Sequence, residues 1–109
     1  MITIHAKPVS LNEAYRGRRF ATQKLKDYEK EVWYQLPDLE IPKGKLFLTL
    51  EFGFSSKGSD ADNAVNCFVD ILAKRYEFND NRVYRLEVEK IDVPKKSEYI
   101  KFSISKYAQ

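Results

Sequence analysis

Residues 46–54 restrict the fold more than any other segment, because their side chains alternate in character at every step. One set of positions is wholly apolar, and it consists of Leu46, Leu48, Leu50, Phe52 and Phe54. The positions between them are held by Phe47, Thr49, Glu51 and Gly53. Successive side chains of a β-strand point to opposite sides, so this pattern predicts a strand with one core face. An acidic segment, Ser59-Asp60-Ala61-Asp62-Asn63, follows it closely.

Two other segments repeat their apolar residues with the period of an α-helix. In the first, residues 22–36, the repeating side chains are Leu25, Tyr28, Val32 and Leu36, with Glu29 and Trp33 beside them. Thr22 is suited to cap its first turn, and Pro37 marks its end. The second extends from Asn63 to about Ala73 and has an apolar face made of Val65, Phe68, Val69 and Leu72. Asp62 or Asn63 is the expected cap of that helix.

Shorter alternating patterns predict the remaining strands. Residues 2–6 are expected to form a short strand, and residues 84–88 and 100–104 alternate in the same way. Residues 8–21 lack such a pattern and are expected to form an irregular arm. The order of strands and helices predicts a single α+β domain over residues 1–109. Its sheet should be mixed or mostly antiparallel, with about four strands and two main helices packed on one face.

The cysteine content and the lack of long apolar segments indicate in which cellular compartment the protein is expected. Cys67 is the only cysteine, so no disulfide can form within the chain. The first residues alternate like a strand and lack the apolar run of a signal peptide, and no segment approaches the roughly 18 apolar residues of a membrane span. These features predict a cytoplasmic protein without a membrane partner.

The net charge of +3 is unevenly distributed along the chain. Residues 1–37 carry seven Lys or Arg side chains against four acids, whereas residues 57–80 carry three against five. This distribution suits a protein whose basic part holds phosphates and whose acidic part holds a metal ion. An ordinary solvated surface is the alternative, and it is favoured for the lysines of residues 24–30. The segment Arg16-Gly17-Arg18-Arg19 is harder to explain in that way.

Three aspartates are candidates for a metal site. Asp60 and Asp62 are two residues apart, so in an extended segment both carboxylates point to one side, and Asp80 can close the site from a separate loop. Oxygen ligands without a second histidine or a thiol cluster favour Mg²⁺ or Mn²⁺ over zinc. His5 is expected to be a strand residue rather than a ligand.

The reach of the chain tests this grouping. A helix ending near Ala73 carries the chain roughly 16 Å from the acidic motif. The residues up to Asp80 can span about 20 Å in return, so the three acids can meet, whereas a helix continuing to Phe78 would prevent it. Asp62, Asn66 and Asp70 also share one polar stripe of this helix. Asp70 is therefore either a further ligand or a solvent-facing acid, and both alternatives remain open.

Taken alone, Asp-x-Asp-Asn is a weak motif, since a helix cap uses the same residue types. The combination of three segments is more specific: Asp60-Ala61-Asp62-Asn63, Phe68-Val69-Asp70-Ile71-Leu72 and Phe78-Asn79-Asp80-Asn81-Arg82-Val83. In this order they resemble the RusA family of Holliday junction resolvases. The amino-terminal Asn12, Tyr15, Arg16 and Gly17-Arg18, ahead of a helix rich in Tyr and Lys, are also similar to the start of that family.

The resemblance implies a small homodimeric endodeoxyribonuclease, often phage encoded, that binds branched DNA. Such an enzyme uses Mg²⁺ to cut two strands of a four-way junction in recombination and repair. Asp60, Asp62 and Asp80 match its catalytic, metal-binding acids, and Asn63, Asn66 and Asp70 are second-layer groups or further ligands. The expected DNA contacts are Asn12, Tyr15, Arg16, Arg18, Arg19 and Lys57. Paired cuts on a two-fold junction require two protomers, and strand edges and apolar residues near Phe47, Tyr99 or Tyr107 are the candidate interface.

Two positions depart from the family pattern. Asn79 replaces the first acid of an Asp-Asp pair, a small change because Asp80 is kept. Asn66 occupies the position of a catalytic lysine, which puts full activity in doubt; Lys57, Lys74 or a second metal ion can substitute, or the enzyme is slow. A junction-resolving nuclease is therefore the leading interpretation. A related DNA-binding protein without catalysis is the second, and an adaptor whose acids only cap a helix is the third.

Overall fold

The computed structural model describes residues 1–9, 15–16, 20–56 and 61–108, and of residues 15–16, 20–21 and 61–63 it describes the backbone alone. The elements along the chain are β1 (Ile2–Ile4), β2 (Tyr15–Arg16), β3 (Phe20–Ala21), α2 (Gln23–Gln35), β4 (Leu46–Phe54), α3 (Ala61–Tyr76), the short 3₁₀ helix η1 (Asp80–Arg82), β5 (Val83–Asp92) and β6 (Tyr99–Lys106). In this part of the chain no helix is both long and apolar enough to cross a membrane.

The main sheet has the strand order β1-β6-β4-β5. β6 is antiparallel to both β1 and β4, whereas β4 and β5 are parallel. A parallel pair needs a crossover between the strands, and α3 supplies it here. β2 and β3 pair separately as a small antiparallel ribbon.

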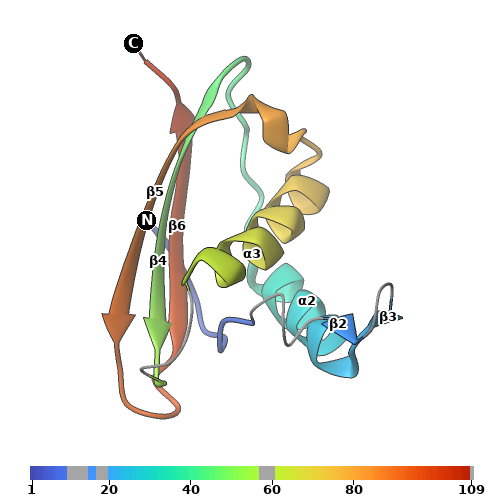
Figure 1. Ribbon diagram of the computed structural model, residues 1–109. Coiled ribbons are helices and arrows are strands. Elements are labelled where there is room, and N and C mark those ends of the chain that lie inside the picture. The colour runs from blue at the N-terminus through green and yellow to red at the C-terminus, as the bar shows by residue number, and fades with distance from the viewer. Residues whose placement is uncertain (10–14, 17–19, 57–60, 109) are drawn as a thin grey trace.

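Both α2 and α3 lie on one side of the main sheet (Figure 1). The alternating side chains of β4 behave as the sequence predicts, since Leu46, Leu48, Leu50, Phe52 and Phe54 are all buried. Phe68 of α3 packs edge-on against Phe52 of β4 and Phe102 of β6, with ring centroids 6.2 and 5.6 Å apart. A four-stranded mixed sheet covered by two helices confirms the predicted α+β architecture.

The start of α2 also follows the prediction, because the Thr22 hydroxyl accepts a hydrogen bond from the Leu25 amide at 3.2 Å. At the other end of α2, the Gln35 side chain bonds to the backbone N–H and C=O of His5, at 2.8 and 3.0 Å. Trp33 was expected near the buried face, but its side chain is 45% exposed. The buried stripe of α2 is narrower than the sequence indicates and contains Leu25, Tyr28 and Val32.

The opposite side of the sheet carries polar and aromatic side chains. Gly53 of β4 lies opposite Tyr99 of β6, and a Cβ atom at Gly53 would come within 2.5 Å of the Tyr99 ring. The missing side chain therefore lets the Tyr99 ring come close to the backbone of β4. In this position the Tyr99 hydroxyl donates a hydrogen bond of 2.6 Å to Glu51.

Candidate functional site

The acidic motif leads into the first turn of α3. Asp62 and Asn63 belong to this helix, which begins at Ala61, and their side chains are outside the description. Asp60 and Lys57 lie outside the described residues altogether. The motif follows β4, as expected, but the helix starts two residues earlier than the predicted Asn63. The predictions that Asp62 or Asn63 caps this helix and that Asp62 belongs to an extended segment are therefore wrong, because both residues are already helical.

Asp80 is the first residue of η1 and is exposed. The preceding residue, Asn79, caps this short helix, since its side-chain oxygen accepts a hydrogen bond of 3.0 Å from the Asn81 amide. Arg82 holds the other end by donating to the backbone carbonyls of Gly44, at 2.8 Å, and Pro42. The carboxylate of Asp80 is therefore presented to solvent from a backbone fixed on both sides, and Asn79 has a structural role of its own.

The segment between α3 and Asp80 is shorter than the sequence suggests. α3 continues to Tyr76 instead of ending near Ala73. Glu77 then adopts the left-handed conformation, with φ at 55°, and the Phe78 amide bonds to the Ala73 carbonyl at 3.1 Å. The side chain of Phe78, next to this turn, is buried.

This extension has a geometric consequence for the three acids. The backbone of Asp62 lies roughly 21 Å from that of Tyr76, at 1.5 Å per residue. From Tyr76 the chain can return at most about 14 Å before it reaches Asp80. Asp62 and Asp80 therefore lie near opposite ends of α3. The distance between their backbones that the side chains and a metal ion must span is larger than that expected for a helix ending near Ala73. Their meeting in one site stays a prediction.

Asp70 and Asn66 are both exposed on α3, whose other side buries Phe68 and Leu72. Of the alternatives for Asp70, this position fits a solvent-facing acid and also leaves the carboxylate accessible to a ligand. Among the described residues, no three His, Cys, Asp or Glu side chains are grouped to hold a metal ion. Asp60 and the side chain of Asp62 are not among them. The proposed ligands are all carboxylate oxygens, a donor set that suits Mg²⁺.

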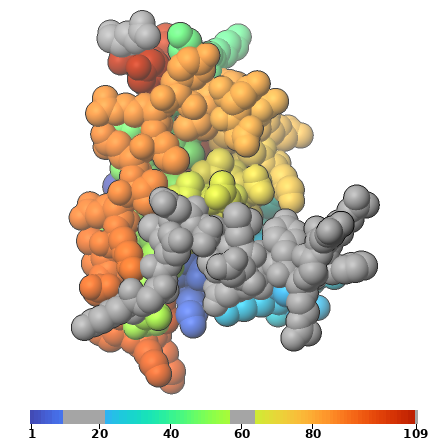
Figure 2. Space-filling model, viewed as in Figure 1, coloured from blue at the N-terminus to red at the C-terminus, as the bar shows by residue number. Residues whose placement is uncertain are grey.

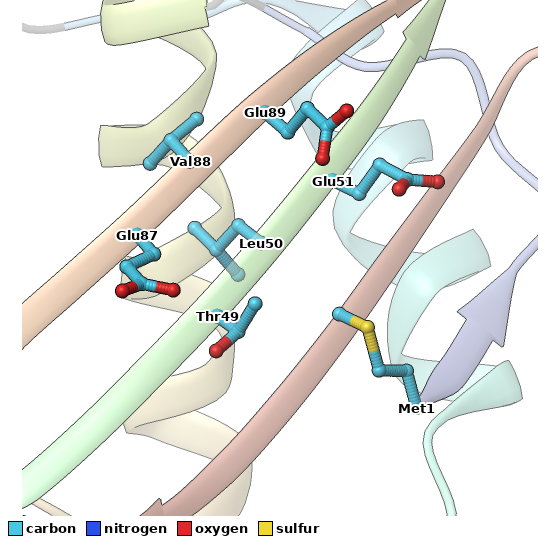
Figure 3. A pocket seen from close by; sticks show the side chains of 7 residues that line it. All are labelled: Met1, Thr49, Leu50, Glu51, Glu87, Val88 and Glu89. Atoms are coloured by element: carbon cyan, nitrogen blue, oxygen red, sulfur yellow. The ribbon is translucent and has the colours of Figure 1, made fainter.

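A shallow hollow of about 510 Å³ lies on the uncovered face of the sheet, over β4 and β5 (Figure 3). Its acidic side chains are Glu51, Glu87 and Glu89. The hydrogen bond from Tyr99 to Glu51 raises the pKa of the Tyr99 hydroxyl to about 12, and burial adds to this shift. Lys101 lies 3.9 Å from the Glu51 carboxylate. The local excess of carboxylates makes this face unfavourable for a phosphate backbone.

An aromatic patch on α2 was missed by the sequence interpretation. Tyr34 is 91% exposed, and Trp33 beside it has the Arg75 guanidinium 6.0 Å from its ring centroid. Arg75 also forms an ion pair of 2.8 Å with Asp38. The signal in the sequence is that Trp33 and Tyr34 follow the buried Val32 directly, so both cannot share its face.

Of the expected DNA contacts, Asn12, Arg18 and Arg19 lie outside the described residues, as Lys57 does. Tyr15 and Arg16 form β2, with only their backbone described. When the sequence is compared with known proteins, no protein-family model and no curated protein matches it.

Proposed function

We propose that this protein is a Mg²⁺-dependent endodeoxyribonuclease that resolves four-way DNA junctions. The observation that carries the proposal is the order of the acidic motifs on one β4–α3–β5 unit. Asp60-Ala61-Asp62-Asn63 leads into α3, Asp70 lies on α3, and Asp80 precedes β5. The resemblance to the RusA family rests on this order, and the three segments lie along a single crossover connection.

In this proposal Asp60, Asp62 and Asp80 would hold the metal ion, and Asp70, Asn63 and Asn66 would be second-layer groups or further ligands. The ion, when bound, supplies a Lewis acid for the scissile phosphate and an activated water as the nucleophile. The protein contributes a well-held backbone at Asp80, because η1 is fixed by Asn79 and Arg82. Carboxylate ligands without bound metal repel DNA, so the ion also makes the site attractive to the substrate.

DNA is expected to approach on the side that carries the helices. The opposite side presents Glu51, Glu87 and Glu89 around its hollow. Arg16 and the neighbouring arginines precede α2 in the chain and supply the opposite charge. A second protomer completes the proposal, since paired incisions on a two-fold junction need two copies of the site.

A second function is supported by one specific residue. Asn66 stands where the related enzymes have a lysine, and asparagine has no charge to offset the growing negative charge of a phosphate under attack. The protein would then bind branched DNA and leave it uncut. Such a protein keeps the salt-sensitive DNA binding of the first proposal without metal-dependent cleavage.

Cleavage and binding measured on the same preparations distinguish the two functions. We expect cutting of a labelled four-way junction with Mg²⁺ and none with chelator. Asp60→Asn, Asp62→Asn and Asp80→Asn should each abolish cutting and leave gel-shift binding equal or tighter, because each removes a ligand and a negative charge. Asp27→Asn, on the exposed side of α2, is the control and should cut normally.

Normal cutting by Asp80→Asn would show that the third ligand is misassigned. Junction binding by the unaltered protein without cutting, in either Mg²⁺ or Mn²⁺, would support the binding function instead. Binding that is absent at low salt would reject both.

A further inference from the structure

β5 is the last strand of the main sheet and pairs only with β4 among the described residues. It is long, from Val83 to Asp92, and almost all of its residues are exposed. In the space-filling view the orange atoms, which include β5, lie along the left margin (Figure 2). The opposite edge strand, β1, has three residues. A short edge strand limits unwanted pairing, whereas a long one offers a row of unpaired backbone groups.

The direction of these backbone groups follows from one hydrogen bond. The Val93 amide donates to the Phe54 carbonyl of β4 at 2.8 Å. Backbone groups alternate along a strand, and the register with β4 is regular from Arg85 to Asp92. The odd-numbered residues of this stretch therefore bond to β4, and the N–H and C=O groups of Leu86 and Val88 point outward.

The side chains of β5 differ between its two faces. Leu86 and Val88 are in register with the buried Leu48 and Leu50, yet they are 43% and 37% exposed. On the uncovered face Arg85 bonds to Glu87 at 2.9 Å. A lysine on an edge strand can hinder pairing with another strand. The ammonium of Lys90 instead lies over the ring of Phe54 in β4, 5.5 Å from the ring centroid. Leucine and valine beside an open edge are a favourable surface for another strand.

We propose that two copies of this chain pair through β5, antiparallel and with Leu86 opposite Leu86, so that the two sheets become continuous. Far from the two-fold axis, Lys90 lies opposite the partner's Arg82, which precedes the strand and donates to the Gly44 and Pro42 carbonyls. Nearer the axis each Arg85 faces the partner's Glu87, and no two like charges between positions 83 and 89 face each other. The four charges alternate around the two-fold axis on one face, while the two Leu86 side chains meet on the other. The interface is isologous, as a closed dimer requires.

Neighbouring registers are less favourable. The backbone groups that point outward belong to even-numbered residues. In an antiparallel pair, an even-numbered residue of one copy must therefore face an even-numbered residue of the other, and an odd-numbered residue an odd-numbered one. Centring the pair on Arg85 sets two arginines opposite each other. Centring it on Glu87 pairs Arg85 with Glu89 but sets two glutamates opposite each other at the axis. Centring it on Val88 sets Glu87 against Glu89 twice. Like charges directly opposite destabilise a strand pair.

The inference uses β5 alone, and it gives the homodimer of the proposed function a defined interface. A charge exchange tests it through sedimentation of the intact protein. Arg85→Glu and Glu87→Arg should each weaken the dimer about tenfold or more, since each creates two like-charge pairs. The double variant restores both pairs and should restore the dimer. Lys43→Glu, an exposed lysine outside β5, is the control and should leave association unchanged.

Disulfide trapping reports the register independently. Paired residues that share hydrogen bonds have Cα atoms about 5.5 Å apart, which is within the range of a disulfide. In a Cys67→Ser background, Leu86→Cys should form a covalent dimer on mild oxidation, whereas Glu87→Cys and Val88→Cys should do so much less. Circular dichroism spectra of each variant establish that it is folded.

A monomer at about 100 µM for the unaltered protein would overturn the proposal, because a specific interface of ordinary size is populated at that concentration. Preferential cross-linking at Glu87→Cys would also overturn it, since the register would then be centred elsewhere. Neither measurement involves DNA or metal, so failure here is distinguishable from failure of the nuclease proposal.

Discussion

Asn66 is exposed on α3, one turn after Asp62 and on the same stripe of the helix. A lysine at this position would project its ammonium beside the acidic motif, where asparagine is too short and uncharged. We expect Asn66→Lys to raise the single-turnover cleavage rate of a Mg²⁺-loaded junction by a factor of about 10²–10³, with much less change in binding. Gln23→Lys adds the same charge on α2 and should have little effect on cleavage.

Equal cleavage rates for Asn66→Lys and the unaltered protein would mean that another cation has the role, and Lys57→Ala and Lys74→Ala would then be compared. For single residues, the sequence predicts which side chains are candidates for the site and in which order they occur. It does not predict which groups surround and hold them. The motif order placed Asp80 before a strand, as observed. The bonds that fix η1 could not be predicted, because Arg82 reaches carbonyls of Gly44 and Pro42 far away in the sequence.

The end of α3 could not be predicted from the apolar pattern of its sequence. No glycine or proline follows Ala73 until Pro94, and Lys74 and Arg75 suit the last turn of a helix, so the helix continues to Tyr76. The terminating left-handed residue is Glu77 instead of the usual glycine. Apolar periodicity marked the core-facing part of α3 correctly and carried no information on this polar last turn.

Replacing Glu77 tests that explanation. A left-handed backbone costs a residue with a side chain roughly 1–2 kcal/mol, and glycine does not have this cost. Replacing the residue by glycine removes this cost, but the greater entropy of glycine in the unfolded chain offsets about 0.5–1 kcal/mol of the stabilisation. Glu77→Gly should therefore raise the free energy of unfolding by roughly 0.5–1 kcal/mol, measured by urea denaturation. Glu77→Ala keeps the strained conformation and serves as the control; equal gains in both variants would contradict the argument.

For the whole molecule, the α+β class was predictable while the strand order was not. Alternation identifies strands, but the choice of partner depends on the crossover through α3, which makes β4 and β5 parallel. β5 also alternates well enough to suggest a buried face, yet it lies at the sheet margin with Leu86 and Val88 exposed. The strand order and the edge position of β5 both depend on pairing between segments that are remote in the sequence. The local alternation of side chains therefore predicts neither.

The helix layer is joined to the sheet through Phe68. Its ring is fully buried between Phe52 and Phe102. Phe68→Ala should lower the free energy of unfolding by about 3–5 kcal/mol, because it removes apolar contacts and leaves a cavity. Phe47→Ala, on the uncovered face, should cost less than about 2 kcal/mol. Urea titrations at one protein concentration make the comparison, and similar losses would place the core elsewhere.

The alternation of backbone groups along β5 also determines how quickly its amide protons exchange with solvent. Arg85, Glu87 and Glu89 donate toward β4, so their exchange must wait for the strand to open. The amides of Leu86 and Val88 face outward and should exchange quickly in dilute protein, where any dimer has dissociated. Raising the protein concentration should slow only this second set. Protection that ignores residue parity would show that β5 does not keep the arrangement described for its edge.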